Sequence, residues 1–209
     1  AYGVDGWDGH AWNTVRLDGE YYHVDVTFDD PINAEPGYIS HTYLNMTDYQ
    51  IWKDHRWNGV FSNTSLKYNN YFMNDTENNP YKNGATYELS GKITLASDIK
   101  VPSDGLVIEL RCEGWSDKYG TLVKIPYGER SASYRFSVPK ALQNFNLLAN
   151  ATNSKDIAYG YYSAEGNNLE YANMTPVNSS RNTNLNITMF KEPGNSTSIH
   201  LPITVALPK

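Results

Sequence analysis

The sequence has little of several features that would mark a particular class of protein. It contains one cysteine in 209 residues, which excludes an intramolecular disulfide framework and a cysteine-rich zinc site. It has no lysine- or arginine-rich run and a formal net charge of −6, so neither nucleic acid nor an anionic membrane is predicted as a main partner. No apolar stretch approaches the roughly 18 residues of a membrane-spanning helix, and no membrane span is predicted.

The chain is long enough to bury a hydrophobic core without disulfides or a metal. At roughly 100–200 residues per domain, one or two domains are expected. Charged residues make up 19% of the chain, whereas tyrosine occurs 17 times. This composition favours many short strands joined by polar turns over long helices.

The second half of the chain has the pattern of an all-β sandwich. Short alternating apolar runs are separated by turn signals, such as Pro102-Ser103-Asp104-Gly105. Seven strands are predicted, at residues 87–95, 106–112, 121–125, 133–138, 144–149, 157–162 and 185–190. This spacing is typical of an antiparallel β-sandwich.

The predicted fold is therefore α+β followed by all-β. The expected units are a first region at 1-73, a polar linker at 74-86, the sandwich at 87-191, and a tail or the start of a further module at 192-209. One helix is predicted in the first region, from Asp48 to about His55, because Thr47 and Gln50 have the spacing of a capping box. His55 is expected to close this helix, where a cation interacts favourably with the helix dipole.

Residues Gly9 to Pro31 predict a β-hairpin that gathers polar side chains on one face. Asp18-Gly19 suits a two-residue turn, which places Asn13 opposite Val24 and Trp12 opposite Asp25. Because side chains alternate along a strand, one face carries His10, Trp12, Thr14, His23, Asp25 and Thr27. The mostly apolar opposite face is expected to be core, and it carries Ala11, Asn13, Val15, Tyr22, Val24, Val26 and Phe28.

His10 and Asp25 are the candidate catalytic residues of this hairpin. His10 is predicted to stand opposite Thr27 and diagonal to Asp25, which brings the imidazole within reach of the carboxylate. A carboxylate in that position fixes the tautomer of the imidazole and stabilises the imidazolium. Trp12 is expected to shield the pair from water. His23 shares the face, and the spacing alone leaves it open as the base, while a one-residue slip in register would separate His10 from Asp25.

The same segment contains residue types that can ligate a metal. Imidazole and carboxylate groups suit a divalent ion, and His10, His23, Asp25, Asp29 and Asp30 all carry them. No recognised ligand spacing such as H-E-x-x-H is present, however. Neither a metal nor any other cofactor is therefore predicted.

Two motifs at matching spacing resemble a known family. His10-Ala11-Trp12-Asn13, followed by Tyr22-His23-Val24-Asp25-Val26-Thr27-Phe28-Asp29-Asp30-Pro31, resembles the second half of a bacterial transglutaminase-like, papain-like core. Downstream, Tyr43-Leu44-Asn45-Met46-Thr47-Asp48 and Asp54-His55-Arg56-Trp57 are similar to secreted clostridial members. The resemblance covers residues 1 to about 60. It implies a Cys–His–Asp triad for acyl chemistry, with His10 as the base and Asp25 as its orienter.

The sequence departs from that family in its nucleophile. The family cysteine lies some tens of residues before the histidine, whereas this sequence begins nine residues before His10. Cys112 shares a predicted strand face with Leu106, Ile108 and Leu110, so it is expected to be a small buried apolar residue. Phe28 stands where the family usually has tryptophan. The chain is therefore expected to be a fragment of a longer enzyme and inactive alone.

The second half resembles, more loosely, a β-sandwich module repeated on surface proteins of low-GC Gram-positive bacteria. The matching segments are Leu89-Ser90-Gly91-Lys92-Ile93-Thr94-Leu95, Pro126-Tyr127-Gly128-Glu129-Arg130-Ser131-Ala132-Ser133-Tyr134 and Tyr159-Gly160-Tyr161-Tyr162-Ser163. This resemblance implies a prealbumin-like or fibronectin-like accessory fold without a catalytic motif. The tyrosines at 159–162 are candidates for stacking on a sugar or partner, or for lining a sheet.

Together the resemblances imply a secreted or cell-surface, cysteine-dependent enzyme that acts on amide or peptide bonds. Its expected partner is a protein or peptide substrate, for example on a cell wall or a host surface, and both hydrolysis and cross-linking stay open. The alternative is a non-catalytic surface module that binds a glycan or a protein. A cysteine upstream of His10 in the parent polypeptide would favour the enzyme. The oligomeric state is not predicted.

Overall fold

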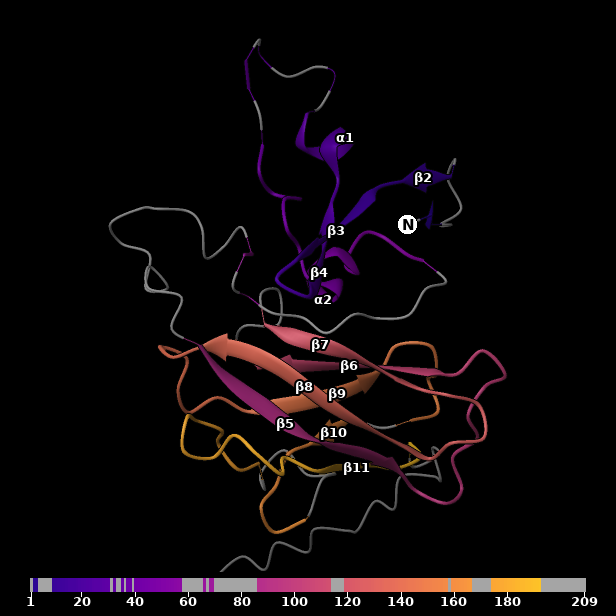
Figure 1. The fold of residues 1–209 in the computed structure, drawn as a ribbon. Helices are drawn as coiled ribbons and strands as arrows, with labels where there is room; N and C mark the ends of the chain where they lie inside the picture. Colours follow the sequence, from indigo (N-terminus) through magenta and orange to yellow (C-terminus); the bar gives the residue numbers. More distant parts are fainter. Residues whose placement is uncertain are drawn as a thin grey trace, which may run out of the picture.

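The computed structural model describes residues 2–3, 9–30, 32, 35, 37–38, 40–57, 66, 68–69, 86–113, 119–157, 159–166 and 174–192. Two parts are visible in Figure 1: an N-terminal region, comprising the described residues up to 69, and a β-sandwich, comprising those from 86 to 192. The prediction of a β-rich fold with little helix is confirmed. None of the helices in the described residues is long and apolar enough to cross a membrane.

The predicted hairpin and its register are confirmed. Strand β3 (Asn13–Leu17) pairs antiparallel with β4 (Glu20–Val24), and Asn13 lies opposite Val24. The turn residues Asp18 and Gly19 have φ values of 49° and 90°, the positive angles that a type I′ turn requires. The hairpin geometry thus follows directly from the Asp-Gly turn.

The hairpin ends earlier than predicted. Strand β4 stops at Val24, and Asp25 caps the short helix α1 (Val26–Asp29) by accepting a hydrogen bond from the Phe28 N–H at 3.2 Å. His10 lies in β2 (His10–Ala11), which pairs with β1 (Tyr2–Gly3) and not with Thr27. The predicted strand through Phe28 was wrong because a carboxylate at an N-cap position satisfies the amide that a ladder would otherwise use.

The expected division of the hairpin into a core face and a polar face was also wrong in part. Val26 and Phe28 were assigned to the core, but they are 60% and 44% exposed. Trp12, His23 and Asp25, from the face that carries the chemistry, are buried. The alternation fails because α1 interrupts the strand and because a second segment of chain covers the polar face.

That second segment is held by β4 and leads into helix α2 (Asp48–Ile51). Met46 and His23 exchange two backbone hydrogen bonds, of 2.8 and 2.9 Å, which places the start of α2 beside the hairpin. The predicted capping box is confirmed: the Thr47 side chain accepts from the Gln50 N–H, and the Gln50 side chain accepts from the Thr47 N–H. The helix is shorter than predicted and is followed by a turn through Asp54.

The sandwich contains all seven predicted strands; β6 has the predicted bounds, and the other six have shifted ends. They are β5 (Thr86–Leu95), β6 (Leu106–Cys112), β7 (Gly120–Ile125), β8 (Ser131–Pro139), β9 (Leu147–Ala151), β10 (Gly160–Tyr161) and β11 (Ile187–Met189). One sheet has the order β10-β9-β6-β7 and the other β11-β5-β8. Figure 1 shows β5 and β8 in front of β6 and β9, as two layers.

One strand pair departs from the antiparallel prediction. Strand β11 runs parallel to β5, with Ile187 opposite Ile93, whereas every other named strand pair of the described residues is antiparallel. A parallel neighbour needs a long crossover connection, and the chain between β5 and β11 contains the rest of the sandwich. Local alternation carries no information about such a pairing.

The sandwich core is apolar, and it contains Cys112. The β6 side chains alternate as predicted, with Leu106, Ile108, Leu110 and Cys112 fully buried. Burial raises the pKa of the Cys112 thiol well above its ordinary value, so it stays protonated and poorly nucleophilic. The predicted assignment of Cys112 to the core is confirmed. Among the tyrosines at 159–162, Tyr162 is buried in this core and Tyr159 is exposed.

The N-terminal region rests on the sandwich through α2, which lies directly against β7 in Figure 1. A Cβ atom at Gly120 would lie 2.6 Å from the Tyr49 ring and 2.5 Å from the Leu110 carbonyl oxygen, so only glycine leaves room for this contact. The Tyr49 hydroxyl donates to Glu109 at 3.2 Å. Predicted features at residues 74–85 and 193–209, including the linker, lie outside the described residues.

Candidate active site

Asp25 is the centre of the candidate site. Its side chain is 1% exposed, and its Oδ2 atom lies 2.5 Å from His10 Nε2 and 2.8 Å from His55 Nε2. Its Oδ1 atom accepts the Phe28 N–H that begins α1. The predicted contact between His10 and Asp25 is therefore present, although it arises from the turn after β4 and not from cross-strand neighbours.

The carboxyl of Asp25 is ionised at neutral pH despite its burial. Burial by itself raises the pKa of Asp25, but the hydrogen bonds from His10, His55 and the Phe28 amide together outweigh it and leave the pKa below its ordinary value of 3.8. An ionised carboxylate only accepts hydrogen bonds. Both Nε2 atoms that face Asp25 Oδ2 therefore carry a proton.

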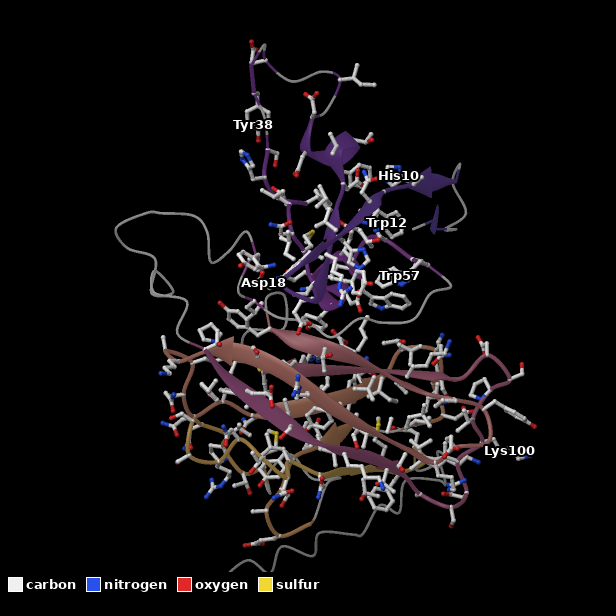
Figure 2. All side chains as sticks on the ribbon, in the orientation of Figure 1. His10, Trp12, Asp18, Tyr38, Trp57 and Lys100 are labelled. Atoms are coloured by element: carbon white, nitrogen blue, oxygen red, sulfur yellow. The ribbon has the colours of Figure 1, made fainter. Side chains whose placement is uncertain are left out.

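His10 has the geometry of a general base. Its Nε2–H donates to Asp25, which leaves the lone pair on Nδ1. The side chain is 31% exposed, and within the described part of the chain Nδ1 has no hydrogen-bond partner. The Phe28 ring stacks on the imidazole with centroids 4.8 Å apart, and Figure 2 shows His10 beside Trp12 on one side of the N-terminal region. The ring is thus oriented at one nitrogen and accessible at the other.

His23, the competing base, is occupied at both nitrogens. Its Nε2 atom lies 2.6 Å from Asp48 Oδ1, and its Nδ1 atom accepts the Trp12 indole N–H at 2.9 Å. An indole nitrogen can only donate, so Nδ1 of His23 must be the unprotonated one. His23 is also buried. This geometry favours His10 over His23 as the candidate base, because both nitrogens of His23 are already engaged.

Trp12 joins the two histidine–aspartate pairs. It is buried, and besides its bond to His23 its ring packs edge-on against His55 at 4.8 Å and lies 6.1 Å from the His10 ring. Its neighbour Trp57 packs edge-on at 6.0 Å. These rings pack around the histidines that contact Asp25, and the shielding role expected of Trp12 stays a prediction.

His55 is the residue of the site that sequence reasoning missed. It was expected to close α2, but its side chain turns back into the site and is 2% exposed. Its Nε2 faces Asp25 and its Nδ1 lies 2.6 Å from Asp54 Oδ1. Asp54 also accepts the Tyr43 hydroxyl at 2.5 Å. No local pattern signals this contact, because His55 and Asp25 are 30 residues apart; the motif Asp54-His55-Arg56-Trp57 was the available hint.

The five residues weighed as metal ligands do not come together. Asp29 accepts the Tyr43 backbone N–H at 2.8 Å, Asp30 is exposed, and His23 is paired with Asp48. A different group converges, since the ligand atoms of His10, Asp25 and His55 all lie within 4.8 Å of one another.

This second group does not fit a metal as it stands. Around a tetrahedral zinc with bonds of about 2.1 Å, ligand atoms would be about 3.4 Å apart. The two nitrogen–oxygen separations of 2.5 and 2.8 Å are instead those of N–H···O hydrogen bonds. Hydrogen bonds from the Nε2–H groups of His10 and His55 to Asp25 therefore explain why these three side chains lie together.

Comparison of the chain with family models, with curated proteins and with solved structures finds no match in any of the three. The resemblance to transglutaminase-like enzymes accordingly stays a prediction. The chemistry of the site follows from its own geometry: an oriented imidazole with one accessible lone pair, backed by a buried carboxylate.

Proposed function

We propose that His10 and Asp25 are the base and the orienting carboxylate of a thiol-dependent acyl-transfer site that acts on amide or peptide bonds. The observation that carries the proposal is the 2.5 Å contact of His10 Nε2 with buried Asp25, which leaves Nδ1 accessible. The only cysteine, Cys112, is buried in the sandwich core with a raised pKa, so it does not serve as the nucleophile. The thiol is assigned to the polypeptide that precedes this sequence, as the resemblance implies.

The proposed chemistry uses His10 twice. First, Nδ1 of His10 takes the proton of the thiol, and the thiolate attacks the substrate carbonyl carbon. The carbon–sulfur bond forms, the carbon–nitrogen bond breaks, and the His10 imidazolium returns its proton to the leaving amine. Water or a second amine then attacks the acyl carbon and gives a proton to His10. The carbon–sulfur bond breaks, and His10 returns this proton to the leaving thiolate. Asp25 stays ionised throughout and stabilises the imidazolium.

The surroundings of His10 support a substrate with apolar side chains. Phe28 is exposed and stacks on the imidazole, and Val26, Ile32 and Tyr38 are exposed elsewhere in the same segment of chain. Exposed aromatic and aliphatic groups beside an oriented base suit a peptide better than a small charged substrate. A protein or peptide at the cell surface is therefore the proposed substrate, and an extracellular location follows from the resemblance.

The test is an assay of the chain joined to its natural preceding segment. Amide hydrolysis or amine incorporation is measured with and without iodoacetamide, which is expected to abolish turnover. His10→Ala is expected to lower kcat by about 10²–10⁴-fold, the usual contribution of a general base. His41→Ala, at an exposed histidine, is the matched control and is expected to leave kcat unchanged.

Two results would overturn the proposal. One is turnover by the extended protein that survives alkylation of its thiols. The other is thiol-inhibitable turnover by the 209-residue chain alone, since the buried Cys112 would then have to be reactive. Absence of a cysteine in the preceding segment would favour the alternative, a surface module that binds a glycan or a protein.

A further inference from the structure

We propose that His55 is a positively charged positioning residue: a buried imidazolium that donates to the same oxygen of Asp25 as His10. The role in catalysis rests on the proposed function, because it assumes that His10 is the base. The charged state of His55 and its effect on Asp25 do not, and they can be measured in this chain without any activity.

The charge of His55 follows from what its two nitrogens face. Nε2 lies 2.8 Å from Asp25 Oδ2, and Nδ1 lies 2.6 Å from Asp54 Oδ1. Both partners are ionised carboxylates, since hydrogen bonds keep the pKa of each below its ordinary value against the opposing effect of burial. A neutral imidazole would direct one lone pair at a carboxylate oxygen. Only the doubly protonated ring donates to both.

Two carboxylates face the ring of His55, and the Arg56 guanidinium donates to the backbone carbonyl of His55 at 2.9 Å. Asp25 comes from the end of β4, and Asp54 from the turn after α2. The His10 ring lies 5.5 Å away, and the rings of Tyr43, Phe28 and Trp12 complete the enclosure at 5.5, 5.0 and 4.8 Å. Burial lowers the pKa of His55, but the bonds to Asp54 and Asp25 outweigh it, and the net pKa is raised above 6.5.

Three hydrogen bonds fix the orientation of the Asp25 carboxylate. Oδ2 accepts from His10 and His55, and Oδ1 accepts from the Phe28 amide. His55 thus donates to the same carboxylate that orients His10, and its single positive charge is shared between Asp25 and Asp54. A neutral, correctly oriented His10 is the form that can take a proton from a thiol.

The first test is the protonation state of the histidines, read from ¹⁵N–¹H long-range correlation spectra of the 209-residue chain at pH 7.5. Both ring nitrogens of His55 are expected to have the shifts of an imidazolium. His23 is the internal reference, because its Nδ1 accepts the Trp12 indole proton and must have the shift of an unprotonated nitrogen. An unprotonated nitrogen on His55 at this pH would overturn the proposal.

The second test separates charge from hydrogen bonding with two variants. His55→Gln keeps a donor near Asp25 but removes the charge, and it is expected to make Asp25 bind its proton roughly tenfold more tightly. Asp54→Asn removes one carboxylate and is expected to make His55 release its proton at lower pH. Side-chain NMR titration measures both changes, and His41→Gln is the control. Unchanged proton affinity of Asp25 in His55→Gln would overturn the proposal. If His55→Gln fails to fold, the titration of His55 in Asp54→Asn serves as the test.

The catalytic part is tested in the extended protein. His55→Gln is expected to lower kcat by about tenfold or more while KM stays within about twofold, because the substrate does not touch His55. If His55 is an imidazolium but the extended protein shows no thiol-dependent turnover, the charged state of His55 is supported and the acyl-transfer function is refuted. Full kcat in His55→Gln would refute the positioning role.

Discussion

The N-terminal region and the sandwich are stabilised by different kinds of buried group. Of the ten polar or charged residues found buried in the described chain, eight lie in the N-terminal region: His23, Asp25, Asp29, Thr47, Asp48, Gln50, His55 and Asn69. The sandwich has Thr121 and Ser163, and otherwise a continuous apolar core. Among the described residues of the N-terminal region, the buried apolar cluster comprises Trp12, Met46 and Ile51.

The difference indicates that the sandwich contributes most of the apolar core, whereas the N-terminal region carries the polar groups of the candidate site. An apolar core is nearly indifferent to pH and tolerates changes that keep volume. A buried polar network is held by specific partners, and the loss of one leaves the others unsatisfied. The N-terminal region is therefore expected to be the more fragile part, and four measurements break or sharpen the comparison.

The largest effect is expected for Asp25→Ala. It leaves the buried His55 imidazolium with Asp54 as its remaining carboxylate partner and removes the N-cap of α1, a loss of about 3–5 kcal/mol by analogy with buried ion pairs that lose one partner. Segment-resolved native-state hydrogen exchange should show this loss at residues 20–57 and little change at 86–192. Asp30→Ala, at the neighbouring exposed carboxylate, is the control. Equal protection in both variants would contradict the polar network as the stabilising feature.

A core truncation should show the reverse pattern. Leu89 in β5 is fully buried, and Leu89→Ala is expected to lower the free energy of unfolding of the sandwich by about 2–5 kcal/mol. Denaturant unfolding followed by hydrogen exchange locates the loss. Tyr127→Ala, at a side chain that is 71% exposed, should change the free energy by less than about 0.5 kcal/mol. A loss confined to the N-terminal region would contradict the comparison.

Acid and alkali should act on the N-terminal region first. The pKa values of Asp25 and Asp54 are lowered, so their stabilisation is present above their ordinary value of 3.8 and is lost as pH falls through the folded-state values. The pKa of His55 is raised, so its stabilisation is present below 6.5 and is lost as pH rises through the folded-state value.

The N-terminal region should therefore be most stable between these limits, while the sandwich changes little. Tryptophan fluorescence and segment-resolved exchange across pH 3–9 measure the two regions separately. The alkaline limb should disappear in His55→Gln. A sandwich that opens at the same pH as the N-terminal region would show that the two parts share one network.

The smallest of the four effects is expected at the capping box. Thr47→Ala removes the acceptor of the Gln50 amide and should cost about 1 kcal/mol, with the loss confined to α2 and its neighbours. Hydrogen exchange of the Gln50 amide is the direct measurement. Thr14→Ala, at an exposed strand position, is the matched control. A loss that spreads into β7 would show that α2 and the sandwich unfold together.

The features that could be predicted from the sequence are those set by neighbouring residues. Asp18-Gly19 specified the turn and with it the hairpin register, and Thr47 with Gln50 specified the start of α2. The alternation in β6 placed Cys112 in the core. Each of these signals lies within a few residues of the structure that it determines.

The features that could not be predicted depend on contacts made by distant parts of the chain. The run Val26-Thr27-Phe28 has strand-like residues, but capping by Asp25 made it helical and exposed Phe28. Two residues from distant segments also meet at Asp25: His10 from β2, and His55, which follows the turn after α2. The contact between His10 and Asp25 was predicted correctly from a strand geometry that does not exist there.

The packing of the Tyr49 ring against Gly120 has a practical consequence for grafting this site onto another protein. Helix α2 packs through Tyr49 against Gly120 of β7, so an excised N-terminal segment would expose this ring and lose the contact. A grafted version would need a host strand with a glycine at the matching place. The minimal portable unit is therefore the site together with β6 and β7.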